Sequence, residues 1–179
     1  MPRLVRPSLA YAPSFIEALG EGYSRDTLRA ETPESIAAVA ADPAGLIASL
    51  VDIPDMIMQP DGSMKPAVPG TNLWYVEGEA FIGSFHIRHE LNEFLEKVGG
   101  HVGYTVRPSA RGQGHASAML AQGLNHIRAN LPLERVLLTV NASNPASIRV
   151  IEKNGGVHTD TIAHIWRPGE TALHYWIDL

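Results

Sequence analysis

The sequence predicts an α+β fold in which helices flank a mixed, mostly antiparallel sheet within one domain over residues 1–179. Helix signals fill the N-terminal part, strand-like runs dominate from residue 71 onward, and strands then alternate with helices toward the C-terminus. A chain of 179 residues with 45% hydrophobic and 18% charged residues has the composition of a globular protein. It contains no internal repeat or low-complexity segment.

Residues 1–70 are expected to form an N-terminal region of helices followed by a long loop. The string LVRPS is a short strand-like entry, and the segment from Ser8 to Leu19 has an incomplete apolar helical face that Gly20 and Gly22 close. Two further helical strings, TPESIAAVAADP and AGLIASLVDI, come next. Asp55–Gly70 is rich in proline and glycine, so we expect a surface loop there.

The first of these two strings has a clear helix start. Thr32 can serve as the N-cap because its hydroxyl can accept a hydrogen bond from the first turn. Pro33 then stands at the first helical position, where the missing N–H group costs nothing.

Strand signals prevail after the loop. NLWYVEG and AFIGSFHIR are joined at Glu77-Gly78-Glu79, which predicts a hairpin. ELNEFLEKV is expected to be a helical turn or a loop that Gly99-Gly100 ends, and HVGYTV is the next strand.

The remaining chain reads helix, strand, helix and hairpin. Ser117–Asn130 is expected to be a helix, RVLLTVN a buried strand, and NPASIRVIEKN a helix that Gly155-Gly156 ends. GVHTDTIAHIWR and ALHYWIDL then pair through a turn at Pro168-Gly169, so residues 158–179 form a terminal hairpin.

Charge and cysteine content exclude several function classes. The net charge is −5 and the basic residues are scattered, which disfavours a nucleic-acid-binding face. The chain has no cysteine, so disulfides, thiolate metal sites and a cysteine nucleophile are excluded. No apolar run approaches ~18 residues and no signal-peptide pattern opens the chain. We therefore expect a cytoplasmic protein that neither enters nor binds a membrane.

The string VRPSARGQGHA, Val106–Ala116, predicts an anion site. It connects a strand to a helix through two glycines, and such a helix start presents unpaired backbone N–H groups backed by the positive end of the helix dipole. Phosphates bind at such positions. Gly112 and Gly114 would let the backbone approach the anion, and Arg111 would add a positive charge.

Three phosphate-binding patterns compete for this loop. The P-loop string GxxxxGK followed by Ser or Thr does not occur in the sequence. The dinucleotide pattern GxGxxG has Ser117 at its third glycine position, and the following strand ends in Asn141 instead of an acidic residue. The third pattern is R-x-x-G-x-A, formed by Arg111, Gly114 and Ala116. A plain glycine turn into a helix also remains open.

The strings HVGYTVRPSARGQGHASAML and LLTVNASNPASIRVIEKNGGV together resemble the two central motifs of the GNAT superfamily of N-acetyltransferases. The resemblance is closest to the branch of ribosomal-protein alanine acetyltransferases and to predicted bacterial acetyltransferases, which IRHELNEFL also resembles. It covers Leu73–Val157, which implies an acetyl-CoA-binding core over residues 71–157 and a central sheet with two splayed strands.

The resemblance also implies how acetyl-CoA would be bound. The backbone of Tyr104, Thr105 and Val106 would hydrogen-bond the pantetheine arm. Amides of the following loop would hold the pyrophosphate, and they belong to Arg111, Gly112, Gln113, Gly114, His115 and Ala116. Asn144 matches the family asparagine that contacts the cofactor, and it can also be the N-cap of the helix that begins at Pro145.

The implied reaction is direct transfer of an acetyl group from acetyl-CoA to a primary amine in a ternary complex. An amine with a pKa near ~10 is mostly protonated at neutral pH and needs a base. Relatives place a glutamate where this chain has His101, and Glu90 and Glu93 are the other candidate bases. Many relatives use a tyrosine acid where this chain has Ile151, which leaves Ser147 as a candidate proton donor.

Because His101 and Ile151 differ from the residues of relatives, a second function also fits the sequence, that of a non-catalytic acyl-CoA-binding or regulatory module. A dinucleotide-binding enzyme is a third alternative. For an enzyme, the acceptor is expected to be a small-molecule or peptide amine, and the acidic cluster of Glu90, Glu93 and Glu96 hints at a cationic one. No metal site is expected, because His86 and His89 on one strand would face opposite sides. The terminal strands could form the edge of a homodimer.

Overall fold

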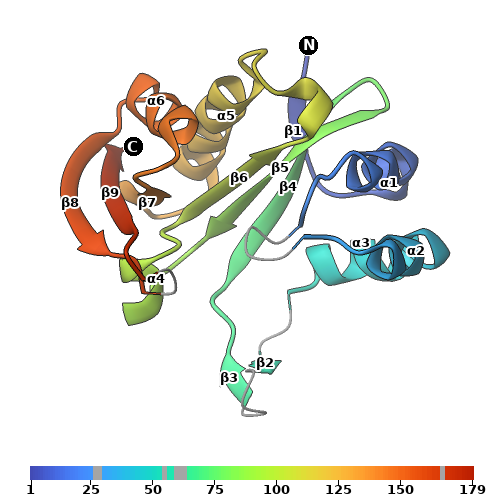
Figure 1. Ribbon diagram of the computed structural model, residues 1–179, viewed down its shortest axis with the longest axis horizontal. Coiled ribbons are helices and arrows are strands. Elements are labelled where there is room, and N and C mark those ends of the chain that lie inside the picture. The colour runs from blue at the N-terminus through green and yellow to red at the C-terminus, as the bar shows by residue number, and fades with distance from the viewer. Residues whose placement is uncertain (26–29, 54–55, 59–63, 166–167) are drawn as a thin grey trace. The chain divides into compact units, whose positions relative to one another are not determined.

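The computed structural model describes residues 1–25, 30–53, 56–58, 64–165 and 168–179. The chain divides into two compact units, which are described in turn. The first unit comprises Met1–Ala67, Asn72–Phe85 and Thr105–His115, and the second comprises Val68–Thr71, His86–Tyr104 and Ala116–Leu179. The elements are labelled in Figure 1, where colour follows the chain from blue to red. A single domain over residues 1–179 remains a prediction.

The first unit opens with the short strand β1 (Arg3–Val5) and a 3-10 turn (Leu9–Tyr11), followed by α1 (Ala12–Gly20). The predicted helix therefore begins later than Ser8. Pro13 explains the break, because a proline in the first helical turn suits a helix start and disfavours a continuous helix through the residues before it.

The helices α2 (Pro33–Ala41) and α3 (Pro43–Val51) confirm both further helix predictions. Thr32 caps α2 as expected, since its Oγ1 accepts from the Ser35 N–H while Ser35 Oγ accepts from the Thr32 N–H. Asp42 then caps α3 by accepting from the Gly45 N–H, and the two helices meet at 90°. No single described helix is long and apolar enough to cross a membrane. Among the described residues, α2 and α3 reach that length and apolar composition only when the bent pair is counted together.

Part of the expected loop over Asp55–Gly70 is a two-stranded ribbon, which corrects the prediction. Strand β2 (Met56–Met58) pairs antiparallel with β3 (Met64–Pro66), with Met56 opposite Pro66. The rest of the loop prediction at residues 54–55 and 59–63 lies outside the described residues.

The predicted hairpin forms from β4 (Gly70–Glu77) and β5 (Ala80–Arg88), and HVGYTV supplies β6 (Val102–Val106). These strands and β1 build a four-stranded sheet in the order β1-β4-β5-β6. β1 is antiparallel to β4, with Leu4 opposite Tyr75. The chain therefore reaches Val106 at the end of an edge strand, where the candidate anion loop begins.

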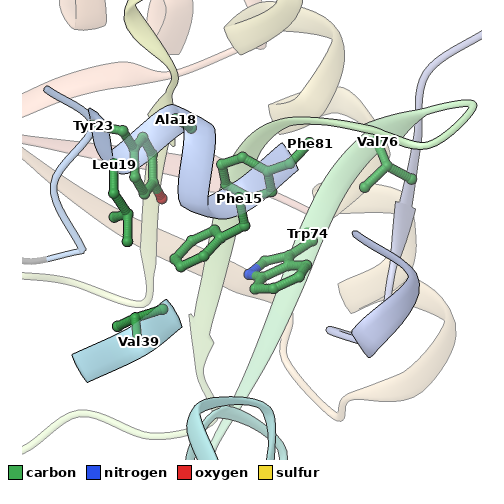
Figure 2. Close-up of a cluster of buried hydrophobic side chains, with 8 residues drawn as sticks. All are labelled: Phe15, Ala18, Leu19, Tyr23, Val39, Trp74, Val76 and Phe81. Carbon is green, nitrogen blue, oxygen red and sulfur yellow. The ribbon is translucent and has the colours of Figure 1, made fainter. Parts of the chain in front are cut away.

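An aromatic cluster forms the core of the first unit, as Figure 2 shows. Phe15 of α1 stacks on Trp74 of β4 with ring centroids 4.7 Å apart, and Phe81 of β5 meets both rings edge-on at 5.0 and 5.2 Å. Tyr23 and Val39 pack against the same cluster. This core holds α1 against the sheet. It thereby positions Glu21, the residue after α1, whose side chain contacts Arg107 at the start of the loop that follows β6.

In the second unit, α4 (Glu93–Lys97) realises the expected helical turn and α5 (His115–Asn130) continues from the first unit. Strand β7 (Arg135–Asn141), helix α6 (Pro145–Lys153) and strands β8 (Val157–Ala163) and β9 (Thr171–Asp178) complete the chain.

The terminal hairpin is confirmed, because β8 and β9 pair antiparallel with a bulge between His158 and Asp160. β9 also pairs with β7, so this sheet has the order β7-β9-β8. The consecutive strands β6 and β7 belong to different sheets. The structure confirms the predicted fold class, with antiparallel sheets flanked by helices.

The aromatic core predicts the first test. Replacing Phe15 by alanine should lower the free energy of unfolding by about 3–5 kcal/mol, because a fully packed ring is lost and a cavity remains. Leu9→Ala is the matched control, since Leu9 is 54% exposed and should change that free energy by less than about 1 kcal/mol. Urea denaturation measures both, and equal losses in the two variants would contradict the core assignment.

Candidate functional site

The loop after β6 has the backbone conformation of an anion cradle. A 3-10 turn at Pro108–Ala110 follows the strand, and α5 begins at His115. Gly112 and Gly114 have φ angles of 75° and 83°, in the left-handed region that side chains other than glycine rarely adopt. A Cβ atom at either position would meet nothing within 4 Å, so glycine is needed for the backbone conformation and not for space.

Most backbone N–H groups of this loop have no backbone partner among the described residues. The turn uses two amides, those of Ala110 and Arg111, which donate to Arg107 and Pro108 carbonyls at 3.1 and 3.2 Å. Among the described residues, no backbone carbonyl outside the helices accepts from the amides of residues 112–116. The last two of these amides open α5, where helix geometry leaves them unpaired. This pattern supports the predicted phosphate site.

The two arginines of the loop have different surroundings. Arg111 is exposed, and within the described part of the chain its guanidinium makes one hydrogen bond, from Nε to the Val106 carbonyl at 3.0 Å. The Arg107 side chain is only 11% exposed, and its guanidinium bonds Glu21, Ser14 and a backbone carbonyl. Arg111 is therefore the arginine that can add charge to a bound phosphate. Arg107 and Glu21, which are 86 positions apart, were not among the site residues predicted from the sequence.

Two of the residues predicted to bind the cofactor have side chains that hold the loop in place. Gln113 Nε2 donates to the Ser109 carbonyl at 3.1 Å. The His115 ring meets Tyr75 of β4 with centroids 6.1 Å apart, and burial raises the pKa of the Tyr75 hydroxyl. With these side chains engaged, Gln113 and His115 would offer their backbone amides to a ligand.

Gly83 holds the end of β6 close to β5. A Cβ atom at Gly83 would lie 2.3 Å from the Thr105 carbonyl oxygen and 3.2 Å from Val106 Cα, so only glycine allows this approach. Arg107 N–H also donates to the Ile82 carbonyl at 2.8 Å. Thr105 and Val106, the predicted backbone partners of the pantetheine arm, are thus fixed by a residue that carried no motif in the sequence.

In the second unit the structure brings Tyr104, Asn144 and Ser147 together. The Tyr104 hydroxyl donates to the Ser147 carbonyl at 3.3 Å, and burial raises the pKa of Tyr104 to about 12. Asn144 Oδ1 accepts from the Ser147 N–H, and Asn144 Nδ2 donates to Ser147 Oγ, both at 3.1 Å. Asn144 is thus the N-cap of α6, and because Ser147 Oγ accepts a hydrogen bond, its own proton can point elsewhere.

Two hydrogen bonds join His101 to Leu137 of β7. Its backbone N–H donates to the Leu137 carbonyl at 2.7 Å, and its Nδ1 accepts from the Leu137 N–H at 2.9 Å. The side chain is buried, and burial followed by the nearby Arg88 charge lowers its pKa. Since Nδ1 accepts, the neutral ring carries its proton on Nε2 and has no lone pair left for another proton. His101 could act as a base only after releasing Leu137.

The two candidate carboxylates lie elsewhere in the second unit. Glu90 follows β5 and Glu93 is the first residue of α4, whose N-cap Asn92 accepts from the Leu95 N–H at 2.9 Å. Both carboxylates are exposed, and no hydrogen bond links either of them to another described residue. No group of three acidic or histidine residues in the described part of the chain could hold a metal ion.

Comparisons with known proteins found a matching family and several similar solved structures. Residues 52–157 match the sequence model of a family described as the acetyltransferase (GNAT) domain. The solved structure of RimJ from Mycobacterium smegmatis with CoA-disulfide is similar at a TM-score of 0.68 and 18% identity, over 99% of this chain and 81% of that one. No curated protein matches the chain.

Two further solved structures share the fold. RimL, a ribosomal alpha-N-protein acetyltransferase in complex with coenzyme A, has a TM-score of 0.63 and 12% identity over 99% of this chain and 94% of that one. A spermidine N-acetyltransferase from Vibrio cholerae, in complex with CoA and spermine, has a TM-score of 0.60 and 12% identity over 99% of this chain and 95% of that one.

The family match covers more than half of the chain and includes both central motifs. It confirms the resemblance to the GNAT superfamily that the sequence predicts. The chain belongs to the GNAT acetyltransferase family.

Proposed function

We propose that this protein transfers an acetyl group from acetyl-CoA to a primary amine by direct attack within a ternary complex. The observation that carries the proposal is the loop after β6, where left-handed Gly112 and Gly114 leave a run of backbone amides for an anion. Coenzyme A, the product form of this donor, is present in the similar RimL and Vibrio cholerae structures.

The cofactor would be held mainly by backbone. Its pantetheine amides would bond the backbone of Tyr104, Thr105 and Val106. Its pyrophosphate would lie on the amides of Gly112–Ala116, because the Arg111 amide already donates to the Pro108 carbonyl. The side chain of Arg111 is exposed and would add charge attraction to the phosphates. Asn144 would contact the cofactor while it caps α6.

The chemistry needs one proton removed and one developing charge stabilised. The neutral amine attacks the thioester carbonyl, the C–N bond forms, and collapse of the tetrahedral intermediate breaks the C–S bond and releases CoA thiolate. A backbone N–H near Thr105 or Val106 would stabilise the oxyanion. Thiolate is a tolerable leaving group because its pKa is near ~8.5, so a dedicated acid is not essential.

Four residues are proposed for proton transfer. Glu90 and Glu93 are exposed carboxylates, which can accept the ammonium proton or bind the ammonium itself. His101 could accept a proton only if its bond to Leu137 opens. Ser147 is the candidate donor to the thiolate, since its Oγ accepts from Asn144 and keeps its own proton available.

The acceptor is proposed to be a small-molecule or peptide amine in the cytoplasm. One structural neighbour binds spermine and another acetylates a ribosomal protein at its α-amino group. The exposed acidic residues Glu90, Glu93 and Glu96 support a cationic acceptor, and the net charge of −5 disfavours nucleic acid. The exposed edge strand β8 would suit a homodimer contact.

The alternative, a non-catalytic acyl-CoA-binding or regulatory module, is supported by Ile151 at the position of the family tyrosine and by the occupied ring of His101. A panel of amines separates the two functions. Acetyl-CoA binding without transfer to any amine and without slow thioester hydrolysis would favour the module, whereas turnover with one amine class would establish the enzyme and its acceptor.

Cofactor binding gives the next prediction. A hundredfold excess of acetyl-CoA over its Kd should stabilise the folded protein by about 2.7 kcal/mol, which differential scanning fluorimetry detects as a higher Tm. NAD should produce no shift. An unchanged Tm at millimolar acetyl-CoA would contradict the proposed function.

Gly114→Ala should weaken acetyl-CoA binding roughly tenfold, because an L residue at φ 83° costs about 1–2 kcal/mol and pulls the loop from its binding conformation. Gly20→Ala is the matched control, since Gly20 is also surrounded by open space and has no left-handed φ. Calorimetric titration measures both Kd values. Equal affinities in the two variants would show that the loop conformation does not matter for binding.

The bond from Leu137 to the His101 ring predicts how substitutions will rank. His101→Ala should lower the free energy of unfolding by about 1–3 kcal/mol, because a buried N–H loses its acceptor. His101→Asn should lose less, because the amide oxygen can replace Nδ1. The lowered pKa makes this contribution complete above pH 6.5 and lost as the pH falls through the folded-state pKa.

Turnover of the same two variants tests His101 as a base. If His101 removes the proton, both variants should lose turnover together with the pH dependence that the lowered His101 pKa sets below pH 6.5. Wild-type turnover and an unchanged pH profile in His101→Asn would eliminate His101 from proton transfer and leave Glu90 and Glu93 as the candidate bases.

A further inference from the structure

Glu21 lies at a helix end that is electrostatically unfavourable for a carboxylate. It follows the last residue of α1, and its backbone N–H still donates to the carbonyls of Glu17 and Ala18 at 3.1 Å. The C-terminal end of a helix carries partial negative charge, so an anionic side chain there is destabilising unless a cation compensates it. Its presence therefore calls for a specific partner.

That partner is the segment that opens the anion loop. The Glu21 carboxylate accepts from Nη2 and Nε of Arg107, the latter at 3.2 Å, in a two-point contact. It also accepts from the hydroxyl and the backbone N–H of Ser109, at 2.7 and 3.3 Å. These bonds lower the pKa of Glu21 to about 2, with the bond from Arg107 the largest cause and that from Ser109 the next.

The contacts continue from Ser109 and Arg107 in two directions. The Ser109 carbonyl accepts from Gln113 Nε2 at 3.1 Å, which ties the turn to the glycine stretch. On the other side, Arg107 Nη1 donates to Ser14 Oγ and to the Phe81 carbonyl, both at 3.0 Å. The turn is thereby fastened to α1 and β5 within the first unit.

We propose that Glu21 is a positioning residue for the donor substrate: it holds the turn Pro108–Ala110 so that the amides beyond it face the phosphates of acetyl-CoA. Its negative charge also neutralises Arg107, so that Arg111 is the loop cation left to attract phosphate. The inference rests on the proposed function, because it assigns a role in the binding of that donor.

The first measurement compares acetyl-CoA affinity by calorimetric titration. Glu21→Gln should raise the Kd at least tenfold, because the amide has one acceptor oxygen in place of two, cannot keep all four hydrogen bonds to Arg107 and Ser109, and leaves Arg107 without its counter-charge. Ser109→Ala removes a single hydroxyl bond and should raise the Kd about threefold. Glu17→Gln, one turn earlier on the exposed side of α1, should bind as the wild type does.

A truncated donor separates positioning from general damage to the fold. S-acetylpantetheine carries the thioester and the pantetheine arm but none of the phosphates. The kcat/KM of Glu21→Gln should fall at least tenfold with acetyl-CoA and stay within about twofold of the wild type with S-acetylpantetheine. The proposal would be overturned if kcat/KM fell equally with acetyl-CoA and with S-acetylpantetheine, both in Glu21→Gln and in the milder Ser109→Ala.

Different results would overturn the proposed function and the positioning role of Glu21. If the wild-type protein does not bind acetyl-CoA, the proposed function itself is wrong. If the wild type binds and both Glu21→Gln and Ser109→Ala match its Kd, only the positioning role of Glu21 is overturned. Because the Glu21 pKa is about 2, the effect of Glu21→Gln should also be the same at pH 6 and pH 8, and an effect confined to one of them would contradict the role.

Discussion

The candidate site depends on one constraint: a run of backbone N–H groups from Gly112 to Ala116 must remain unpaired and yet be held in place. Such groups cannot be ordered by a sheet or helix ladder, since ladder bonds would consume the donors. The first unit solves this with side chains that fasten the loop from its flanks. Glu21 holds Arg107 and Ser109, Gln113 bonds back to Ser109, and the His115 ring meets Tyr75. The donors are thereby preorganised without being used.

Other predicted site residues also have structural roles. Asn144 caps α6, Tyr104 bonds the first turn of the same helix, and His101 attaches the start of β6 to β7. Binding through backbone amides explains how this is compatible with function. When the ligand is recognised by main-chain groups, the side chains at those positions are free to stabilise the fold, and the sequence motif mainly records the glycines that permit the conformation.

Local signals predicted most of the elements and the loop, because caps, turns and periodicity act over a few residues. The Thr32 N-cap, the hairpin at Gly78 and the glycines of the anion loop are of this kind. The pairing of Glu21 with Arg107 could not be predicted, since it joins residues 86 positions apart and Glu21 belongs to no motif. The need for glycine at position 83 arises only when two strands approach closely. Likewise, a histidine at the start of a strand gives no sign that a backbone N–H will occupy its ring nitrogen.

Amide hydrogen exchange tests the central claim most directly, because it reports on the very groups that are proposed to bind phosphate. Exchange would be followed residue by residue in the free protein and with saturating acetyl-CoA. The account predicts fast exchange of the amides from Gly112 to Ala116 in the free protein and strong protection of the same amides in the complex. Protection elsewhere in the chain, with these five amides exchanging as fast as before, would contradict it.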